Sequence, residues 1–193
     1  MKEKWFPVFF ALFFGFVCIQ RLLETFARRA VIRGDRFMRW SFPIMMVIHS
    51  GIFVSSAVEY MVVDRPINYT VSLVAAAFYV FALALRNSAI RTLGRYFSLH
   101  IEIRGQHELI KCGVYRYIRH PIYLAVVVEL LSVPLVPNAY YTTLAALVLY
   151  MPLLAMRLRQ EEREMLAKFG EAYRQYQREA GALLPRLVPR RKT

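Results

Sequence analysis

Residues 121–156 read PIYLAVVVELLSVPLVPNAYYTTLAALVLYMPLLAM, and this stretch decides the fold class. It holds two apolar blocks, residues 121–136 and 140–156, which are separated by little more than Pro137 and Asn138. Proline and asparagine between two apolar blocks are typical of a tight turn. The stretch therefore predicts a helical hairpin that lies in a membrane, with its turn at one membrane face.

Three further apolar blocks precede the hairpin, at residues 5–23, 40–63 and 71–85. A bilayer core requires about 20 apolar residues in a helix, within a range of about 17–25. The first two blocks reach that length, whereas the third block and the two hairpin blocks are at or just below its lower limit. With 58% hydrophobic residues and a mean hydropathy of +0.36, the chain is predicted to be an all-α integral membrane bundle of five transmembrane helices.

The charges lie between the apolar blocks. Lys and Arg total 26 against 13 Asp and Glu, a formal net charge of +13. Six of the basic residues lie in 21–39, seven in 86–119 and ten in 157–193, and five alternating helices place these three segments on one side. Cytoplasmic loops carry the excess of Lys and Arg in membrane proteins. We therefore expect a multi-pass protein with its N-terminus outside and its C-terminus and long loops in the cytoplasm. The scattering of the basic residues excludes a nucleic-acid-binding protein.

This layout predicts two regions. Residues 1–90 are expected to form an N-terminal region of three transmembrane helices. Residues 91–193 are expected to hold a polar loop, the hairpin and an amphipathic helix that continues the last block as one helix to about residue 178. Cys18 lies in an apolar block and Cys112 in a basic loop, so no disulfide is expected. No Cys/His cluster has the spacing of metal ligands, so no metal site is predicted.

Polar residues gather at two points on the expected cytoplasmic side. Residues 105–123 contain two glycines, three tyrosines and two histidines and place His120 and Pro121 at a helix start. This group is either an interfacial loop or a polar ligand site. Arg157 and Glu161 lie four residues apart on one helical face. Three interpretations of them are open: a surface ion pair, an arginine that reaches lipid phosphates, or a functional pair. Three further polar residues receive no functional role from the sequence: His49, which is expected to hydrogen-bond between helices, Glu59 and His100.

These two groups carry a resemblance to a known family. The matching elements are His107-Glu108-Leu109-Ile110, Gly113-Val114-Tyr115, Arg119-His120-Pro121-Ile122-Tyr123, a second hairpin helix, Arg157 with Glu161, Phe169-Gly170-Glu171-Ala172-Tyr173 with Tyr176, and Leu184-Pro185. In this order and spacing, residues 95–188 resemble the isoprenylcysteine carboxyl methyltransferase family of small membrane methyltransferases. Ile110 stands where valine is usual, and the first three apolar blocks match the family in hydropathy only.

The resemblance implies that S-adenosylmethionine binds at the cytoplasmic face and leaves as S-adenosylhomocysteine. The implied pocket is formed by the loop before the fourth helix and by the C-terminal helix. The residues that the resemblance assigns to the cofactor are His107, Glu108, Leu109, Ile110, Tyr115, His120, Pro121, Ile122, Tyr123 and Glu161. It assigns a cationic part of the cofactor to Glu161 and the carboxylate of the acceptor to Arg157. Arg157 and His120 are the catalytic residues that it implies.

The activity that the resemblance implies is methyl transfer to a lipid-like acceptor, with carboxyl O-methylation of an isoprenylcysteine-type substrate first. A phenolic or pyrone lipid, for which His120 or a tyrosine would serve as base, and the amine of a phospholipid headgroup are the enzymatic alternatives. A membrane scaffold or carrier is the non-enzymatic alternative; a carrier is disfavoured because no apolar block carries an interior pair of charges. The expected partners are the lipid or prenylated substrate and membrane lipids, without nucleic acid or metal.

Overall fold

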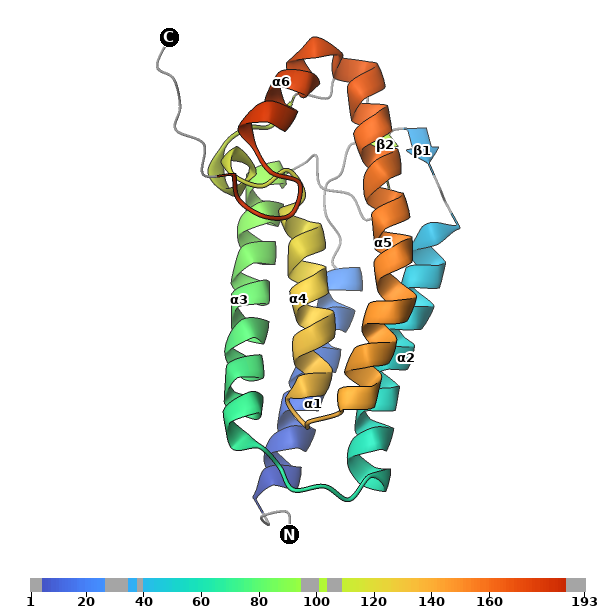
Figure 1. Cartoon of the computed structure of the whole chain (residues 1–193), viewed down its shortest axis with the longest axis vertical. Helices are drawn as coiled ribbons and strands as arrows, with labels where there is room; N and C mark the ends of the chain where they lie inside the picture. Colours follow the sequence, from blue (N-terminus) through green and yellow to red (C-terminus); the bar gives the residue numbers. More distant parts are fainter. Residues whose placement is uncertain (1–4, 27–34, 38–39, 95–100, 104–108, 187–193) are drawn as a thin grey trace.

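The chain folds as a bundle of long helices that run along a common axis, with a short helix folded over one end (Figure 1). The computed structural model describes residues 5–26, 35–37, 40–94, 101–103 and 109–186. The described helices are α1 (Phe6–Phe26), α2 (Ser41–Val62), α3 (Tyr69–Leu93), the short 3-10 helix η2 (Gly113–Arg116), α4 (Pro121–Leu135), α5 (Tyr140–Phe169) and α6 (Glu171–Glu179). The strands are β1 (Asp35–Phe37) and β2 (Ile101–Ile103).

Four of the described helices are long and apolar enough to cross a membrane, namely α1, α2, α3 and α5. Helices α3 and α5 exceed the predicted third and fifth blocks because they continue to Leu93 and Phe169. Helix α4 has only 15 residues, about 22 Å at 1.5 Å per residue, which is less than a bilayer core of about 30 Å. Four spans are therefore supported where five were expected, and a complete crossing by α4 stays a prediction.

Successive long helices run in opposite directions (Figure 1). As a result, the ends of α1, α3 and α5 and the starts of α2 and α4 lie at the same end of the bundle, together with α6. The polar residues before α4 and those after the apolar part of α5 therefore meet at this end. The location of this end in the cytoplasm stays a prediction.

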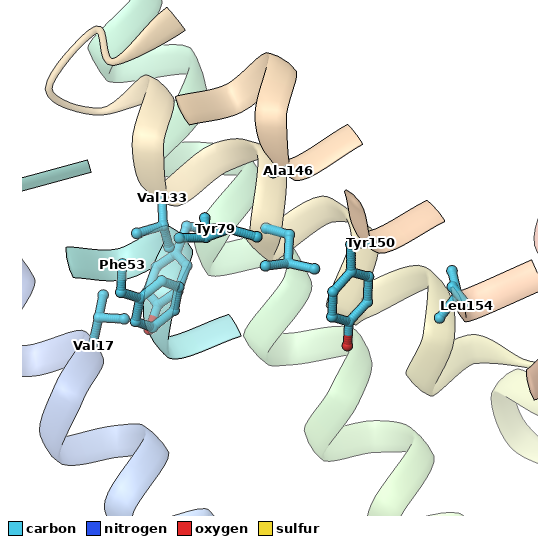
Figure 2. Close-up of a cluster of buried hydrophobic side chains, with 9 residues drawn as sticks. Val17, Phe53, Tyr79, Val133, Ala146, Tyr150 and Leu154 are labelled. Carbon is cyan, nitrogen blue, oxygen red and sulfur yellow. The ribbon is translucent and has the colours of Figure 1, made fainter. Parts of the chain in front are cut away.

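A buried core joins the five long helices (Figure 2). Its members include Val17 of α1, Phe53 of α2, Tyr79 of α3, Val133 of α4 and Tyr150 of α5, all at most 5% exposed. Large apolar side chains on the outside of the same helices are exposed, as expected for surfaces that face lipid. Because lipid is as apolar as leucine, close packing and interhelical hydrogen bonds hold such a bundle together.

The predicted tight turn between α4 and α5 is confirmed, and the contacts beside it show the role of the Glu59 carboxylate. Asn138 adopts a left-handed conformation with φ of 60°, and its side-chain oxygen accepts a hydrogen bond of 2.6 Å from the backbone N–H of Asn68. The carboxylate of Glu59 accepts bonds from the backbone N–H of Thr142 at 2.7 Å and from its hydroxyl at 2.8 Å. Glu59 also pairs with Arg65 at 3.2 Å. This glutamate on α2 thus caps the start of α5 and has a structural role.

A cluster of charges lies inside the bundle, which corrects the expectation that no apolar block carries an interior pair. Glu129 of α4 is fully buried and Arg86 of α3 is 3% exposed, and they are joined by a bond of 2.5 Å. Arg21 of α1 donates to both oxygens of Glu129, from Nε at 2.6 Å. Arg86 also donates to Glu24 of α1 at 3.0 Å, and His49 of α2 lies 3.8 Å from Glu129. Arg86 was predicted in the loop after the third block and Arg21 beside the first, but both belong to the bundle interior.

The helix of the fifth block ends earlier than expected. It continues beyond the apolar block, as predicted, but Gly170 with φ of +52° ends it after Phe169, and α6 folds back across the bundle end (Figure 1). The fold is all-helical in class, as predicted, with a short addition in which β1 and β2 pair antiparallel with Arg36 opposite Glu102. This pairing ties the connection between α1 and α2 to the segment that precedes α4.

Candidate functional site

The start of α4 is fastened by the chain that follows α6. The backbone N–H groups of Arg119 and His120 donate to the carbonyls of Gly181 and Ala182 at 2.8 and 3.0 Å, and the N–H of Gly181 donates to Tyr117 at 3.1 Å. Glycine is required at position 181, because a Cβ there would lie 1.9 Å from the carbonyl oxygen of Leu184. Residues separated by about 60 positions in the sequence thereby form one rigid edge that carries His120.

His120 stands between two carboxylates of α5. Its Nδ1 lies 3.6 Å from Glu161 and its Nε2 lies 3.2 Å from Glu162. The ring of Tyr123 stacks on the imidazole with centroids 5.6 Å apart, and the Tyr123 hydroxyl donates to Glu161 at 2.6 Å. The two polar groups singled out in the sequence, one before α4 and one on α5, therefore form a single site.

The two glutamates control the charge of His120. Burial lowers the pKa of this histidine, but hydrogen bonds to Glu161 and Glu162 and their negative charges outweigh burial and raise the pKa from 6.5 to about 9. An imidazole with that pKa is protonated at neutral pH. The site therefore presents a buried cation, His120, between two anions.

Glu162 and Arg119 connect this site to the end of α6. Arg119 donates to one oxygen of Glu162 from Nε at 2.9 Å and from Nη2 at 2.6 Å. The other oxygen of Glu162 accepts from the side-chain amide of Gln177 at 3.2 Å. Arg119 also donates to the carbonyl of Gln177 at 3.2 Å and to the carbonyl of Ala180. Neither Glu162 nor Arg119 was assigned a role from the sequence, although both are next to residues that were.

Arg157 lies one helical turn before Glu161 and is 4% exposed. Its Nη1 donates to the hydroxyl of Ser41 at 2.6 Å, and Ser41 is fully buried at the first position of α2. A guanidinium that is buried and held this way is not a solvated surface charge or one that reaches for lipid phosphates. The sequence contains no signal for Ser41, because the N-terminal blocks matched the family in hydropathy only.

The other predicted cofactor residues lie around this group or outside the described residues. Tyr115 is buried in η2, and its carbonyl accepts a 2.5 Å bond from the Tyr176 hydroxyl. Leu109 packs against the buried cluster of Tyr173 and Tyr176. The remaining residues are Ile110 and Ile122, both partly buried, Pro121, which is buried, and His107 and Glu108, which lie outside the described residues. His100, which received no role from the sequence, also lies outside them.

Neither cysteine forms a disulfide, as predicted, and within the described ranges no three His, Cys, Asp or Glu side chains are grouped as metal ligands.

Comparison with known proteins relates this chain to a known family. The model of the isoprenylcysteine carboxyl methyltransferase (ICMT) family matches residues 73–167, which include α4, His120 and Glu161. The protein-S-isoprenylcysteine O-methyltransferase of Schizosaccharomyces pombe is 29% identical over 60% of this chain and 49% of that protein. The methanethiol S-methyltransferase of Mycobacterium tuberculosis is 36% identical over 45% of this chain and 32% of that protein.

The fold has a counterpart among solved structures. The eukaryotic intramembrane Ras methyltransferase ICMT superposes with a TM-score of 0.55 at 23% sequence identity, over 74% of this chain and 52% of that chain. The chain thus spans about half the length of that methyltransferase. The candidate membrane spans and the matches to methyltransferases define the class of protein as a membrane methyltransferase. Through residues 73–167, just under half of its length, the chain resembles the ICMT family.

Proposed function

We propose that this protein transfers the methyl group of S-adenosylmethionine to a lipid-like acceptor at the membrane, with the carboxylate of an isoprenylcysteine-type molecule as the first choice of acceptor. The observation that carries the proposal is the contact of His120 and Tyr123 on α4 with Glu161 on α5. The division into a transmembrane region of residues 1–90 and a methyltransferase region of 91–193 is part of the proposal, although the Arg157–Ser41 bond crosses it.

The charges of the site fit the amino-acid end of the cofactor. S-adenosylmethionine, when bound, supplies a methyl group on a sulfonium and carries an ammonium and a carboxylate. Glu161 is the residue that we assign to the cationic groups, because a buried cation requires a nearby anion. His120 is a cation at neutral pH and is suited to the carboxylate of the cofactor. The backbone of residues 107–110 and the side chain of Tyr115 complete the proposed cofactor site with Pro121 and Ile122.

Arg157 is the residue that we assign to the acceptor. A guanidinium binds a carboxylate through two parallel hydrogen bonds, and Arg157 lies one turn from Glu161 on the same face of α5. A carboxylate acceptor is ionised at neutral pH and requires no general base. The methyl donor is a cation and the acceptor is an anion, so their opposite charges cancel as the methyl group moves. A buried site at the membrane edge favours a reaction in which charge is lost.

The protonation of His120 bears on the alternative acceptors. A phenol or an enol must lose a proton, and a histidine that is already protonated at neutral pH is a poor base for that step. This argues for an acceptor that ionises without help, such as a carboxylate. A small thiol must also lose a proton before it reacts, and it is the second candidate because it is the acceptor class named for the methanethiol S-methyltransferase relative. Phenolic or pyrone lipids, phospholipid amines and a scaffold or carrier role rank below it.

Acceptor choice can be tested directly. The purified protein in lipid nanodiscs is incubated with methyl-labelled S-adenosylmethionine and, in separate arms, N-acetyl-S-farnesylcysteine, methanethiol, an alkylpyrone or phosphatidylethanolamine. We expect label on the carboxylate of the first acceptor and loss of that label in Arg157→Ala. Label on methanethiol alone would replace the acceptor but keep the enzyme, and no label in any arm together with no binding of S-adenosylmethionine would refute the proposal.

The cytoplasmic position of the site is proposed from the distribution of Lys and Arg. A reporter fused after residue 193 tests it. Alkaline phosphatase is active only outside the cytoplasm and green fluorescent protein only within it. We expect fluorescence without phosphatase activity, and the reverse pattern would invert the proposed topology.

A further inference from the structure

Glu162 is hydrogen-bonded through both of its carboxylate oxygens. One carboxylate oxygen accepts two bonds from Arg119 and lies 3.2 Å from Nε2 of His120, and the other accepts from Gln177. These partners come from the turn before α4 and from α6, whereas Glu162 itself belongs to α5. A single carboxylate therefore joins three separate parts of the chain at the site.

The imidazole of His120 is oriented from both sides. The shorter of its two contacts is the one with Glu162, at 3.2 Å from Nε2, while Glu161 lies 3.6 Å from Nδ1. With Nε2 engaged by Glu162, the Nδ1 edge faces Glu161, the proposed partner of the cofactor. Loss of Glu162 leaves the longer contact with Glu161 and the stacked ring of Tyr123 to hold the imidazole.

We propose that Glu162 is a positioning residue of the cofactor site, which keeps His120 charged and turned toward Glu161 while Arg119 fastens the end of α6 over the start of α4. The proposal rests on the proposed function, because it presumes that His120 faces the cofactor. Glu162 itself acts through His120 and is not assigned a contact with the cofactor.

The charge of His120 reflects every group packed around it. Among the residues that the structure describes, the ionisable groups that face this part of the site are Arg119 and Tyr115 before α4, Tyr123 on α4, Arg157, Glu161 and Glu162 on α5, and Tyr173 on α6. The hydrogen bonds and charges that raise the pKa of His120 come from Glu161 and Glu162. Replacement of Glu162 by glutamine removes one of these two charges and moves the pKa of His120 back toward its ordinary value of 6.5.

The test is the binding of S-adenosylhomocysteine, a chemically stable probe, measured by calorimetry between pH 5.5 and 9. Below about pH 6, His120 is protonated in the wild type and in Glu162→Gln, so the two dissociation constants are expected to be similar. Near pH 8 the histidine is protonated in the wild type only, and Glu162→Gln is expected to bind about tenfold more weakly, as for the loss of one charge-assisted hydrogen bond. Titration of the probe itself is common to both proteins and cancels in the ratio.

A double-mutant cycle separates positioning from a general effect on the fold. In the His120→Asn background, Glu162→Gln is expected to change the dissociation constant less than twofold, because the residue through which it acts is absent. Glu164→Gln is the matched control on the same helix, since Glu164 bonds to Gln160 and not to the site. A ratio that is the same at every pH, or an undiminished effect of Glu162→Gln without His120, would overturn the proposal.

A wild type that fails to bind the probe would refute the proposed function, and the inference with it. Binding by the wild type with no effect of Glu162→Gln would refute the inference alone. The titration of His120 in histidine-labelled protein, followed by NMR without any ligand, gives an independent readout. We expect its midpoint to fall from about 9 in the wild type by more than one pH unit in Glu162→Gln, and an unchanged midpoint contradicts the inference.

Discussion

Replacement of Glu129 by leucine is expected to destabilise the bundle strongly. Glu129 is fully buried and neutralises Arg86 at 2.5 Å and Arg21 at 2.6 Å. Without it, the two guanidinium groups share one oxygen of Glu24, at 3.0 and 3.3 Å, and the interior keeps one excess positive charge. Removal of one partner from a buried ion pair costs about 3–5 kcal/mol, and an arginine at the centre of a membrane helix costs about 2.5–3.5 kcal/mol. We therefore expect a loss of about 3 kcal/mol or more.

The double variant Glu129→Leu/Arg86→Leu is the decisive comparison. It leaves Arg21 paired with Glu24 and restores a balanced charge, so it is expected to be more stable than Glu129→Leu by at least about 2 kcal/mol, despite the second substitution. Unfolding by sodium dodecyl sulfate in mixed micelles, followed by far-UV circular dichroism, measures both free energies. If Glu129→Leu lies within about 1 kcal/mol of the wild type, or if the double variant shows the sum of the two single losses, the reasoning about charge balance is refuted.

Three other outcomes follow from the site and its supports. The pKa of His120 is raised to about 9 from 6.5, so the stability that its imidazolium contributes is complete below pH 6.5 and is lost as the pH rises through 9. The melting temperature of the wild type should fall over that window. An equal fall in His120→Asn would contradict this cause. Ser41→Ala removes the hydrogen bond to Arg157 and should raise the KM of the acceptor about fivefold, as for one hydrogen bond of about 1 kcal/mol. The affinity for the cofactor should not change. Equal changes in KM and in cofactor affinity would assign Arg157 another role. Gly181→Ala forces a Cβ to 1.9 Å from the Leu184 carbonyl oxygen and should weaken cofactor binding. Gly15→Ala is the control, because no atom lies within 4 Å of its Cβ. Identical binding of the cofactor by both variants would show that the segment after α6 does not support the site.

Several features of the fold were predictable because they depend on neighbouring residues. The turn at Pro137 and Asn138 and the start of α4 at Pro121 follow from local backbone preferences, and the structure confirms both. The extent of the helices was less predictable. The third apolar block stops at the first charged residue after it, whereas α3 continues through Arg86 to Leu93 because the partners of Arg86 lie on other helices. The pairing of Glu161 with the region before α4 was expected only through the resemblance to a family, since the sequence alone left both groups open to a structural interpretation.

By itself the sequence determined that this is a helical membrane protein with two polar groups, because hydropathy, turn residues and motif spacing are properties of consecutive residues. The methyltransferase role of these groups came from the resemblance to a family. Only the tertiary structure decided which charges are buried and which residues complete the site. Arg21 and Glu129 are 108 positions apart, and Ser41 and Arg157 are 116 apart. Such pairs arise from the packing of one helix against another, and a buried charge is stable only where that packing supplies its partner.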